Sequence, residues 1–400
     1  MAINKATIYN QLLDTVVSAG LTSSPLTAKA SMVKYDGGDT VKIAKIETSG
    51  FGDYSRTAGY PSGTASLNWG TYTFPYDRGV KFLIDAMDED ETANMLTSGN
   101  LITDFAANNE VPEVDAARYS SIFQAIVDDD TAVYGYYTPV EADVLSKFNA
   151  DIGKVREKVG RRNVNLIAFM SESTFTVLSN ATQLSKELMT QDVTGENGVT
   201  TDIHKLNGVQ IIPVPDACMK TEYAFSATDG FAPKVWAQDM NWIICSPDAV
   251  LAVEKHRKMK VHSADVVQGY DGELVEARLM HGCWVLDNKH NMIYISLKEA
   301  ALPTIDEAGG DIDNEADNME IILGDAFTNR DTGHEFYYLD TDSSTAPTAP
   351  KPYDVVDVSS YTKITVPTEV NVTVVTDDYG IVVQLDEHGR AVAYTAIKVI

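Results

Sequence analysis

The sequence predicts an α+β fold that continues into a small all-β domain of the immunoglobulin type. Strand-like and helical patterns mix along residues 34–300 without the strict alternation that a doubly wound parallel sheet requires. From residue 319 onward only strand-like runs and turns remain. These two observations separate a mixed core at 34–300 from a β domain at 319–400, with an acidic linker at 301–318.

The stretch from residue 69 to 130 is the element around which the core is organised. Val80, Phe82 and Ile84 alternate with polar neighbours, which is the period of a strand with one buried face. Acidic residues then crowd together at 85–91, and carboxylates suit the positive N-terminal end of a helix. The helical region that follows has one apolar stripe: Tyr119, Ile122, Phe123 and Ile126. We therefore predict a strand that leads into a spine helix within residues 88–130.

Composition is typical of a folded protein from a reducing compartment. The 400 residues suggest more than one compact unit, and 44% of them are hydrophobic. No apolar run approaches the roughly 18 residues of a membrane span, and the first residues lack the apolar core of a secretory signal. The three cysteines form no paired motif. A net charge of −27 argues against nucleic-acid binding, because such proteins need basic patches that neutralise phosphates.

Two segments have side chains that they cannot bury within their own length. Residues 1–33 contain a short amphipathic helix, which predicts an arm that lies on the body or on a neighbour. Residues 49–70 are rich in glycine, and their large side chains are aromatic. As a hairpin they would reach roughly 30–35 Å, and an isolated hairpin is marginal in water. A floppy surface loop is one interpretation. We favour an arm that a partner subunit orders, with the aromatic residues as anchors.

The last hundred residues differ from the rest in charge. Residues 301–400 contain 19 acidic and 5 basic side chains, which is about half of the excess negative charge of the chain. A polar, proline-rich spacer at 343–352 interrupts the strand-like runs. The linker predicts an independent unit, so deleting residues 319–400 should leave assembly intact.

The sequence contains no recognisable catalytic, cofactor or metal site. The nucleophile elbow, the P-loop, the dinucleotide fingerprint and the zinc-protease motif are absent. His281 and Cys283 would share one face of a strand, but two ligands do not make a metal site, so we interpret them as structural. The acidic run 88–91 lacks the glycine-centred spacing of a calcium loop.

One concentration of basic residues has two interpretations. It comprises Lys81, Lys154, Arg156, Lys158, Arg161 and Arg162. Cations complement the negative end of a helix, which is the first interpretation. The second is a contact with the acidic surface of another subunit.

Five residues are candidates for contacts between subunits: Tyr54, Arg56, Tyr60, Trp69 and Arg78. The first four belong to the glycine-rich hairpin. Arg78 is a lone arginine within an apolar strand run, which predicts that it pairs with a carboxylate. Whether that carboxylate lies across a subunit boundary is left open by the sequence.

Several motifs follow one another along residues 30–298. They are Gly50-Phe51-Gly52-Asp53-Tyr54-Ser55-Arg56, the run from Thr71 to Thr92, the run from Val111 to Tyr119, the run from Asn207 to Pro215, and Cys283-Trp284-Val285-Leu286-Asp287-Asn288-Lys289 leading to Ile293-Tyr294-Ile295. In their order and spacing they resemble the major capsid proteins of tailed bacteriophages, which have the Hong Kong 97-type shell fold.

The resemblance implies a specific arrangement of parts and partners. Residues 1–33 would be the N-terminal arm, 48–78 the extended loop that lies across a neighbouring subunit, 88–130 the spine helix of the peripheral domain, and about 205–290 the axial domain. Family members assemble as pentamers and hexamers into icosahedral shells around DNA, which they enclose without specific binding. The implied partners are a separate scaffold, a portal and decoration proteins. The implied location is the virion, after assembly in the bacterial host cytoplasm, with no membrane, cofactor or catalysis.

Other functions remain as alternatives. A bacterial nanocompartment shell would use the same fold, although the β domain and the hairpin favour a phage. A cell-surface adhesin would use residues 319–400 to bind a ligand. An enzyme would need His281, Cys283 and carboxylates to converge in one pocket.

Overall fold

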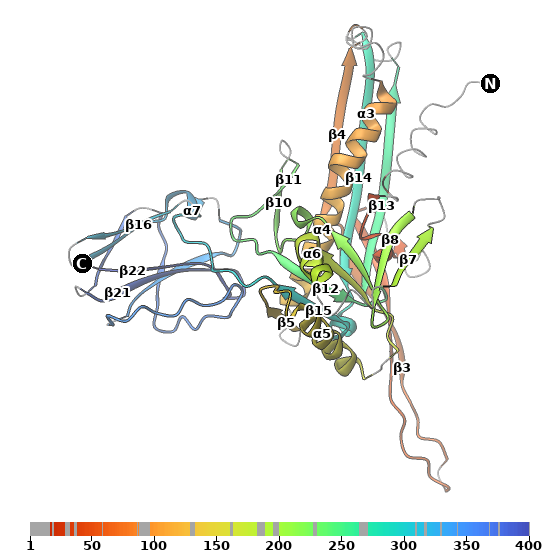
Figure 1. Cartoon of the computed structure of the whole chain (residues 1–400), viewed down its shortest axis with the longest axis horizontal. Coiled ribbons are helices and arrows are strands. Elements are labelled where there is room, and N and C mark those ends of the chain that lie inside the picture. Colours follow the sequence, from red (N-terminus) through yellow and green to blue (C-terminus); the bar gives the residue numbers. More distant parts are fainter. Residues whose placement is uncertain are drawn as a thin grey trace.

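The computed structural model describes most of the chain. The described residues are 17, 20–28, 33–35, 38–57, 59–85, 87, 97–128, 133–160, 163–181, 189–194, 200–226, 230–263, 271–308, 310–315, 318–328, 330–341, 343–367, 369–374 and 377–399. A central body has three projections: a long limb of strands and helix, a thin hairpin on the opposite side, and the C-terminal domain to one flank (Figure 1). The predicted α+β class is confirmed.

A seven-stranded mixed sheet forms the body. Its order is β5 (Val133–Tyr136), β15 (Ile293–Leu297), β12 (Met240–Cys245), β6 (Ile167–Ser171), β9 (Val209–Val214), β8 (Thr200–Leu206) and β7 (Met189–Thr194). Three adjacent inner strands, β15, β12 and β6, are buried along their whole length, because helices cover both faces. On one face lie α5 (Val144–Val159) and α6 (Glu172–Asn180). Gly160 ends α5 in the left-handed conformation.

The spine helix covers the other face of this sheet. It consists of α3 (Ser98–Phe105), a π-helical turn at Ala106–Glu110, and α4 (Val111–Val127), which follow one another without a break. The predicted stripe of Tyr119, Ile122, Phe123 and Ile126 is completely buried and packs on the body sheet. Of the predicted range 88–130, residues 88–96 and 129–130 lie outside the described part of the chain.

A three-stranded antiparallel sheet forms the long limb. Its order is β13 (Val250–His262), β14 (Gly272–Val285) and β4 (Tyr76–Asp85). One face of the sheet packs on the start of the spine helix through Ile84, Val275 and Met259. The two-stranded ribbon of β10 (Tyr223–Phe225) and β11 (Phe231–Pro233) stands beside the limb (Figure 1).

The hairpin sheet is made of β1 (Val33–Tyr35), β2 (Thr40–Thr48) and β3 (Ala65–Thr73). The predicted extended loop 48–78 is therefore shifted. The paired strands begin at Thr40, and residues 76–78 already belong to β4 of the long limb. Short 3₁₀ helices at Ser24–Leu26, Asp216–Cys218 and Asp287–Met292 complete the body.

Two antiparallel sheets make up the C-terminal domain. One has the order β16 (Asp311–Glu315), β17 (Asn318–Ile322) and β20 (Val370–Thr373). The other has the order β19 (Thr362–Ile364), β18 (Glu335–Asp340), β21 (Tyr379–Leu385) and β22 (Ala391–Lys398). A short helix α7 (Gly324–Thr328) connects β17 to β18. When the strands β16 to β22 are numbered 1 to 7 in chain order, the two sheets have the orders 1-2-5 and 4-3-6-7. A constant immunoglobulin domain has the orders 1-2-5-4 and 3-6-7, so the two folds differ in the sheet to which the fourth strand, β19, belongs.

The structure differs from two of the predicted boundaries. Residues 311–315 of the predicted linker form β16, and Ile305 and Ile312 are buried in the core of the C-terminal domain. The predicted axial unit 205–290 is not one unit, because β13 and β14 pair with β4 in the long limb. Residues 20–28 of the predicted arm 1–33 pack on the body, which is one of the two placements expected for it.

Candidate assembly surfaces

The hairpin leaves the body at a definite point. At its base, Val41 and Ile43 are fully buried against residues of β13 and the strands beside it. Beyond Ala44 the register continues to the pair Thr48 and Ala65, but β3 from Ala65 to Trp69 is exposed. The base is therefore held by apolar packing. Beyond Ala44, Lys45 pairs with Asp287 of the body at 3.6 Å, and the hairpin outside this pair is held by its own ladder.

The predicted contact residues of the hairpin are all exposed. Tyr60 exposes 89% of its surface, Tyr54 60% and Trp69 47%; Arg56 is exposed as well. The Tyr54 and Tyr60 rings stack edge to face at 5.1 Å, and Phe51 beside them is fully exposed. Large aromatic side chains gathered at one tip are typical of an anchor for a partner surface.

Arg78 has a carboxylate partner within its own chain. Its Nε donates to Glu113 on the spine helix at 2.6 Å, and one Nη donates to the backbone carbonyls of Ser226 and Gly230. The planar guanidinium thus joins β4, the spine helix and the ribbon of β10 and β11. Its predicted role in a subunit contact stays a prediction.

Asp115 anchors the N-terminal segment to the spine helix. This buried carboxylate accepts hydrogen bonds from the backbone N–H and the hydroxyl of both Thr22 and Ser23. Arg118 lies beside it, donates to the Ser23 hydroxyl at 3.0 Å, and pairs with Glu254 of β13 at 2.6 Å. The direction in which the chain enters the body is therefore fixed by a network inside one copy.

We expect Asp115→Ala to lower the free energy of unfolding by about 3 kcal/mol or more, since it leaves buried donors without acceptors. Urea unfolding and proteolysis within residues 20–28 would measure the loss. Asp104→Ala is the matched control, because that carboxylate is exposed and bonds only to Asn108 among the described residues. Equal effects of the two substitutions would contradict the anchoring role.

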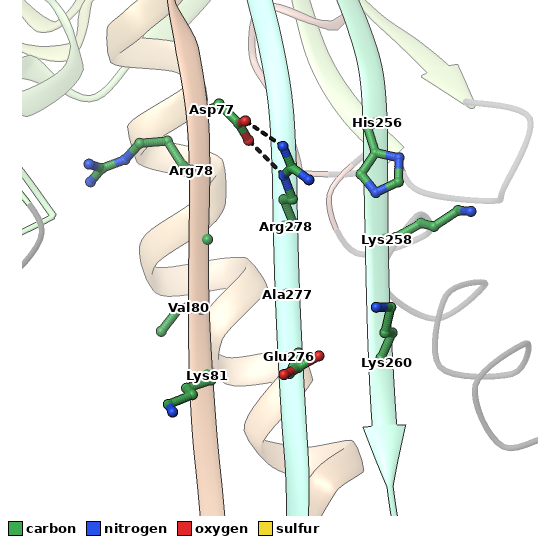
Figure 2. A pocket seen from close by; sticks show the side chains of 11 residues that line it. Asp77, Arg78, Val80, Lys81, His256, Lys258, Lys260, Glu276, Ala277 and Arg278 are labelled. Carbon is green, nitrogen blue, oxygen red and sulfur yellow. Dashed lines mark hydrogen bonds and ion pairs between the residues drawn. The ribbon is translucent and has the colours of Figure 1, made fainter. Parts of the chain in front are cut away.

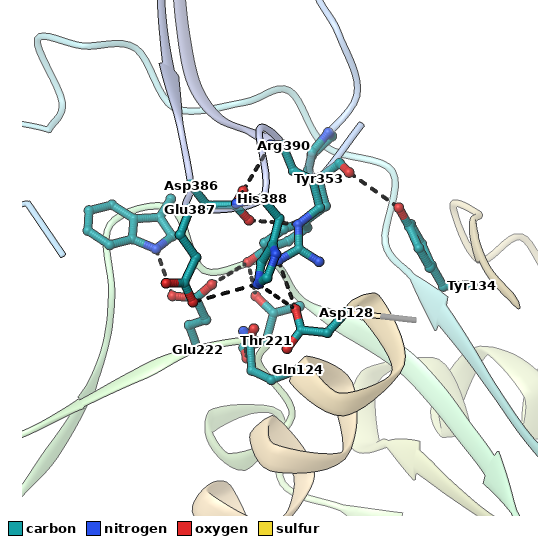
Figure 3. Close-up of polar contacts among 12 residues, drawn as sticks. Gln124, Asp128, Tyr134, Thr221, Glu222, Tyr353, Asp386, Glu387, His388 and Arg390 are labelled. Carbon is teal, nitrogen blue, oxygen red and sulfur yellow. Dashed lines mark hydrogen bonds and ion pairs between the residues drawn. The ribbon is translucent and has the colours of Figure 1, made fainter. Parts of the chain in front are cut away.

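The C-terminal domain is fastened to the body by a buried tyrosine and a set of ion pairs (Figure 3). Tyr353 has its ring against Phe123 of the spine helix at 5.0 Å, and its hydroxyl bonds to Thr221 and Glu222. Arg390 pairs with Asp386 at 2.7 Å and with Asp128 at the end of the spine helix at 3.0 Å. The domain is therefore part of the body's packing.

A second group of contacts lies on the same junction. Lys234 of the body pairs with Asp331 of the C-terminal domain, and Trp236 packs on His334 at 5.1 Å between ring centroids. Burial lowers the pKa of His334, which keeps this ring neutral at the junction. Aromatic and charged contacts together cover the side of the domain that faces the body.

His281 and Cys283 do not form a catalytic arrangement. Burial lowers the pKa of His281 to about 3, and the nearby Arg118 and Arg257 add to this effect. Burial raises the pKa of Cys283 to about 12, so the thiol stays protonated at neutral pH. The imidazole stacks on Tyr76 at 5.1 Å. Both side chains therefore serve packing, in agreement with their structural interpretation.

His281 should make stability depend on pH in one direction. The unfolded chain takes up a proton near pH 6.5, whereas the folded chain resists it until about pH 3. Its contribution is complete above about pH 7 and is lost as pH falls towards 3. We expect His281→Phe to flatten the curve of unfolding free energy against pH by up to about 1.4 kcal/mol per pH unit. His256→Phe on β13 is the control; parallel curves for wild type and His281→Phe would refute the assignment.

Three further features would indicate another function: a reactive pocket, a metal site or a membrane-spanning helix. A pocket of about 600 Å³ lies between the long limb and the spine helix, and four of its charged lining groups form ion pairs, Arg78 with Glu113 and Arg257 with Glu110. The described residues contain no group of three or more His, Cys, Asp or Glu side chains suited to a metal ion. None of the helices in the described part combines the length and apolar character that a membrane crossing needs.

The predicted basic concentration is divided by the fold. Lys81 lies on β4 of the long limb, while Lys154, Arg156 and Lys158 lie on α5 of the body. Lys154 pairs with the buried Asp151 at 2.9 Å, and Arg156 donates to the carbonyl of Asn207. Arg161 and Arg162 lie outside the described residues. The α5 cations thus fit the helix-end interpretation.

Comparison with known proteins gives structural similarity and no sequence match. No protein-family model matches the chain, and no curated protein matches it. A structure of Mycobacterium phage Che8 is 14% identical with a TM-score of 0.42, and the match covers 68% of this chain and 90% of that one. The capsid of cyanophage P-SCSP1u is 13% identical with a TM-score of 0.44, covering 67% and 85%. A virus-like particle from Pyrococcus furiosus is 10% identical with a TM-score of 0.43, covering 74% and 100%.

The chain is thus similar to phage capsid proteins, the family that its sequence resembles. The extended hairpin and the spine helix, which the sequence resemblance implied, are both present in the fold. The TM-scores are below 0.5, so the function proposed next depends on the chain's own geometry.

Proposed function

We propose that this chain is the major capsid protein of a tailed phage, a structural subunit that assembles with copies of itself into a closed shell. One observation carries the proposal: a hairpin anchored at its base presents Phe51, Tyr54 and Tyr60 at a tip that its own chain does not cover. Burial of exposed aromatic groups is the main favourable term in protein association. A second copy of the chain supplies the surface that covers these aromatic side chains.

The same proposal includes the shell that the subunits form and the partners that they need. The copies form pentamers and hexamers of an icosahedral shell that encloses DNA without binding it specifically, since the net charge of −27 repels phosphates. A scaffold and a portal guide assembly in the host cytoplasm, and decoration proteins bind outside. Subunits act structurally, because the buried His281 and Cys283 provide no reactive group.

Electron microscopy and sedimentation velocity of the expressed chain test the proposal, with and without a co-expressed scaffold. We expect ring-shaped capsomers or closed particles of uniform size. A chain that stays monomeric at high concentration in both settings would refute the proposed function.

A further inference from the structure

One face of the long limb is basic and exposed in the described part of the chain. The face of the sheet opposite the spine helix carries His256, Lys258, Lys260, Arg278 and Lys81, which we call the basic face (Figure 2). These side chains point to one side because they occupy alternate positions on three paired strands. Gly79 stands next to Arg278 in the register and leaves the middle of the face open.

Among the described residues, this face has more cations than carboxylates. Arg278 forms an ion pair with Asp77 through two hydrogen bonds. Glu276 lies opposite Lys260 on β13 and opposite Lys81 on β4. Lys81, Lys258 and Lys260 are exposed and form no ion pair among the described residues. Four cations against two carboxylates make a positive surface on a chain whose net charge is −27.

The C-terminal domain has a face of the opposite sign. Asp311 and Asp313 are exposed on the edge strand β16, and Asp306 and Glu307 are exposed in the turn before it; these four define the acidic face. Asp313 lies directly opposite Glu320 of β17, and like charges opposed in a ladder destabilise it. Burial and the charges of Asp311 and Asp313 raise the pKa of Asp306.

The cations of residues 301–400 are all engaged elsewhere. Arg390 pairs with Asp386 and Asp128, Lys363 with Glu335, Lys398 with Asp377, Lys351 with Glu299, and Arg330 donates to the carbonyls of Phe327 and His334. Among the described residues, no cation pairs with the acidic face. Its charge is therefore available to a partner.

We propose that the basic face of one copy binds the acidic face of a second copy. The inference rests on the proposed function, because it names two surfaces that meet when copies assemble. The faces lie on different projections of the molecule, the long limb and the C-terminal domain (Figure 1). A contact that joins two different surfaces is heterologous, and repeated contacts of this kind form a ring when the rotation between copies closes.

Charge balance favours a second copy over DNA as the occupant. Copies with a net charge of −27 repel one another, so assembly needs contacts in which opposite charges meet. DNA meets the same repulsion, and nucleic-acid interfaces are more uniformly positive than a face that includes Asp77 and Glu276. The acidic face offers four carboxylates to the free lysines.

A charge-swap experiment on the full chain tests the proposal. One variant carries Lys258→Glu and Lys260→Glu, a second carries Asp311→Lys and Asp313→Lys, and a third carries all four. We expect each two-residue variant to raise the concentration needed for particle formation at least about tenfold at low salt, and less at high salt. The four-residue variant should restore assembly. Lys205→Glu with Lys289→Glu is the control with the same charge change outside both faces.

The outcomes separate the proposal from its alternatives. Assembly unchanged by either reversal, or not restored by the combination, overturns the contact. Loss of affinity for random-sequence DNA by the basic-face variant, with assembly intact, overturns it in favour of a polyanion. Circular dichroism excludes misfolding, and Lys258→Gln with Lys260→Gln repeats the test without new carboxylates. A wild-type chain that forms no particles refutes the proposed function itself.

Discussion

Replacing residues 49–64 with the dipeptide Asn-Gly should abolish assembly and leave the chain folded. The pair Thr48 and Ala65 is the last rung of the hairpin ladder, and Asn-Gly closes two strands in a tight turn. The described residues of the removed tip contribute no buried apolar side chain, and Phe51, Tyr54 and Tyr60 are exposed. The free energy of unfolding should therefore change by less than about 0.5 kcal/mol, while particle yield falls to background.

A second variant separates the aromatic groups from the length of the loop. It keeps all residues of the tip and carries Phe51→Ser, Tyr54→Ser and Tyr60→Ser. We expect the same loss of particles, because hot-spot contacts concentrate in a few aromatic side chains. Particles at wild-type yield from the shortened chain would contradict the idea that the tip is an assembly contact. A large fall in monomer stability would show that the tip packs on its own body.

Features with a local signal were predicted from the sequence. The stripe of the spine helix recurs at spacings of three and four, so the buried face of α4 could be named residue by residue. Gly160 marked the end of α5 because only glycine adopts the left-handed conformation there without strain. The hairpin was evident because strongly strand-like flanks enclose glycine and aromatic residues that have no aliphatic partners.

Features that depend on distant partners were missed. Residues 301–318 resemble a linker because they are rich in acidic residues and contain a Gly-Gly pair, yet Ile305 and Ile312 supply the apolar contacts that fold them into the C-terminal domain. Asp115 lies within the helix pattern, and nothing near it in sequence indicates that it binds residues 22 and 23. The basic and acidic faces likewise emerge only when strands far apart in the chain are paired.

Tyr353→Ala should separate the C-terminal domain from the body. The side chain is fully buried in the main core, and removing a buried aromatic ring costs about 3–5 kcal/mol. Its backbone N–H also bonds to Ala391, and its φ of 63° is held by these contacts. We expect one cooperative unfolding transition in the wild type and two in the variant, measured by calorimetry. Tyr353→Phe keeps the ring and loses only the bonds to Thr221 and Glu222, so it should cost about 1 kcal/mol.

The same contacts reverse the expectation that residues 319–400 are dispensable. That deletion removes Tyr353 and Val392 from the core cluster around Phe123. It also leaves β16 without the strand β17 with which it pairs. The truncated chain should be less stable than the full one and poorer in assembly, because the end of the spine helix loses Arg390 as the partner of Asp128. Normal particles from the truncated chain would mean that the contacts between the C-terminal domain and the body position this domain but are not needed for assembly. Loss of particles together with loss of monomer stability would instead make the C-terminal domain a structural part of the subunit, folded with the body before copies meet.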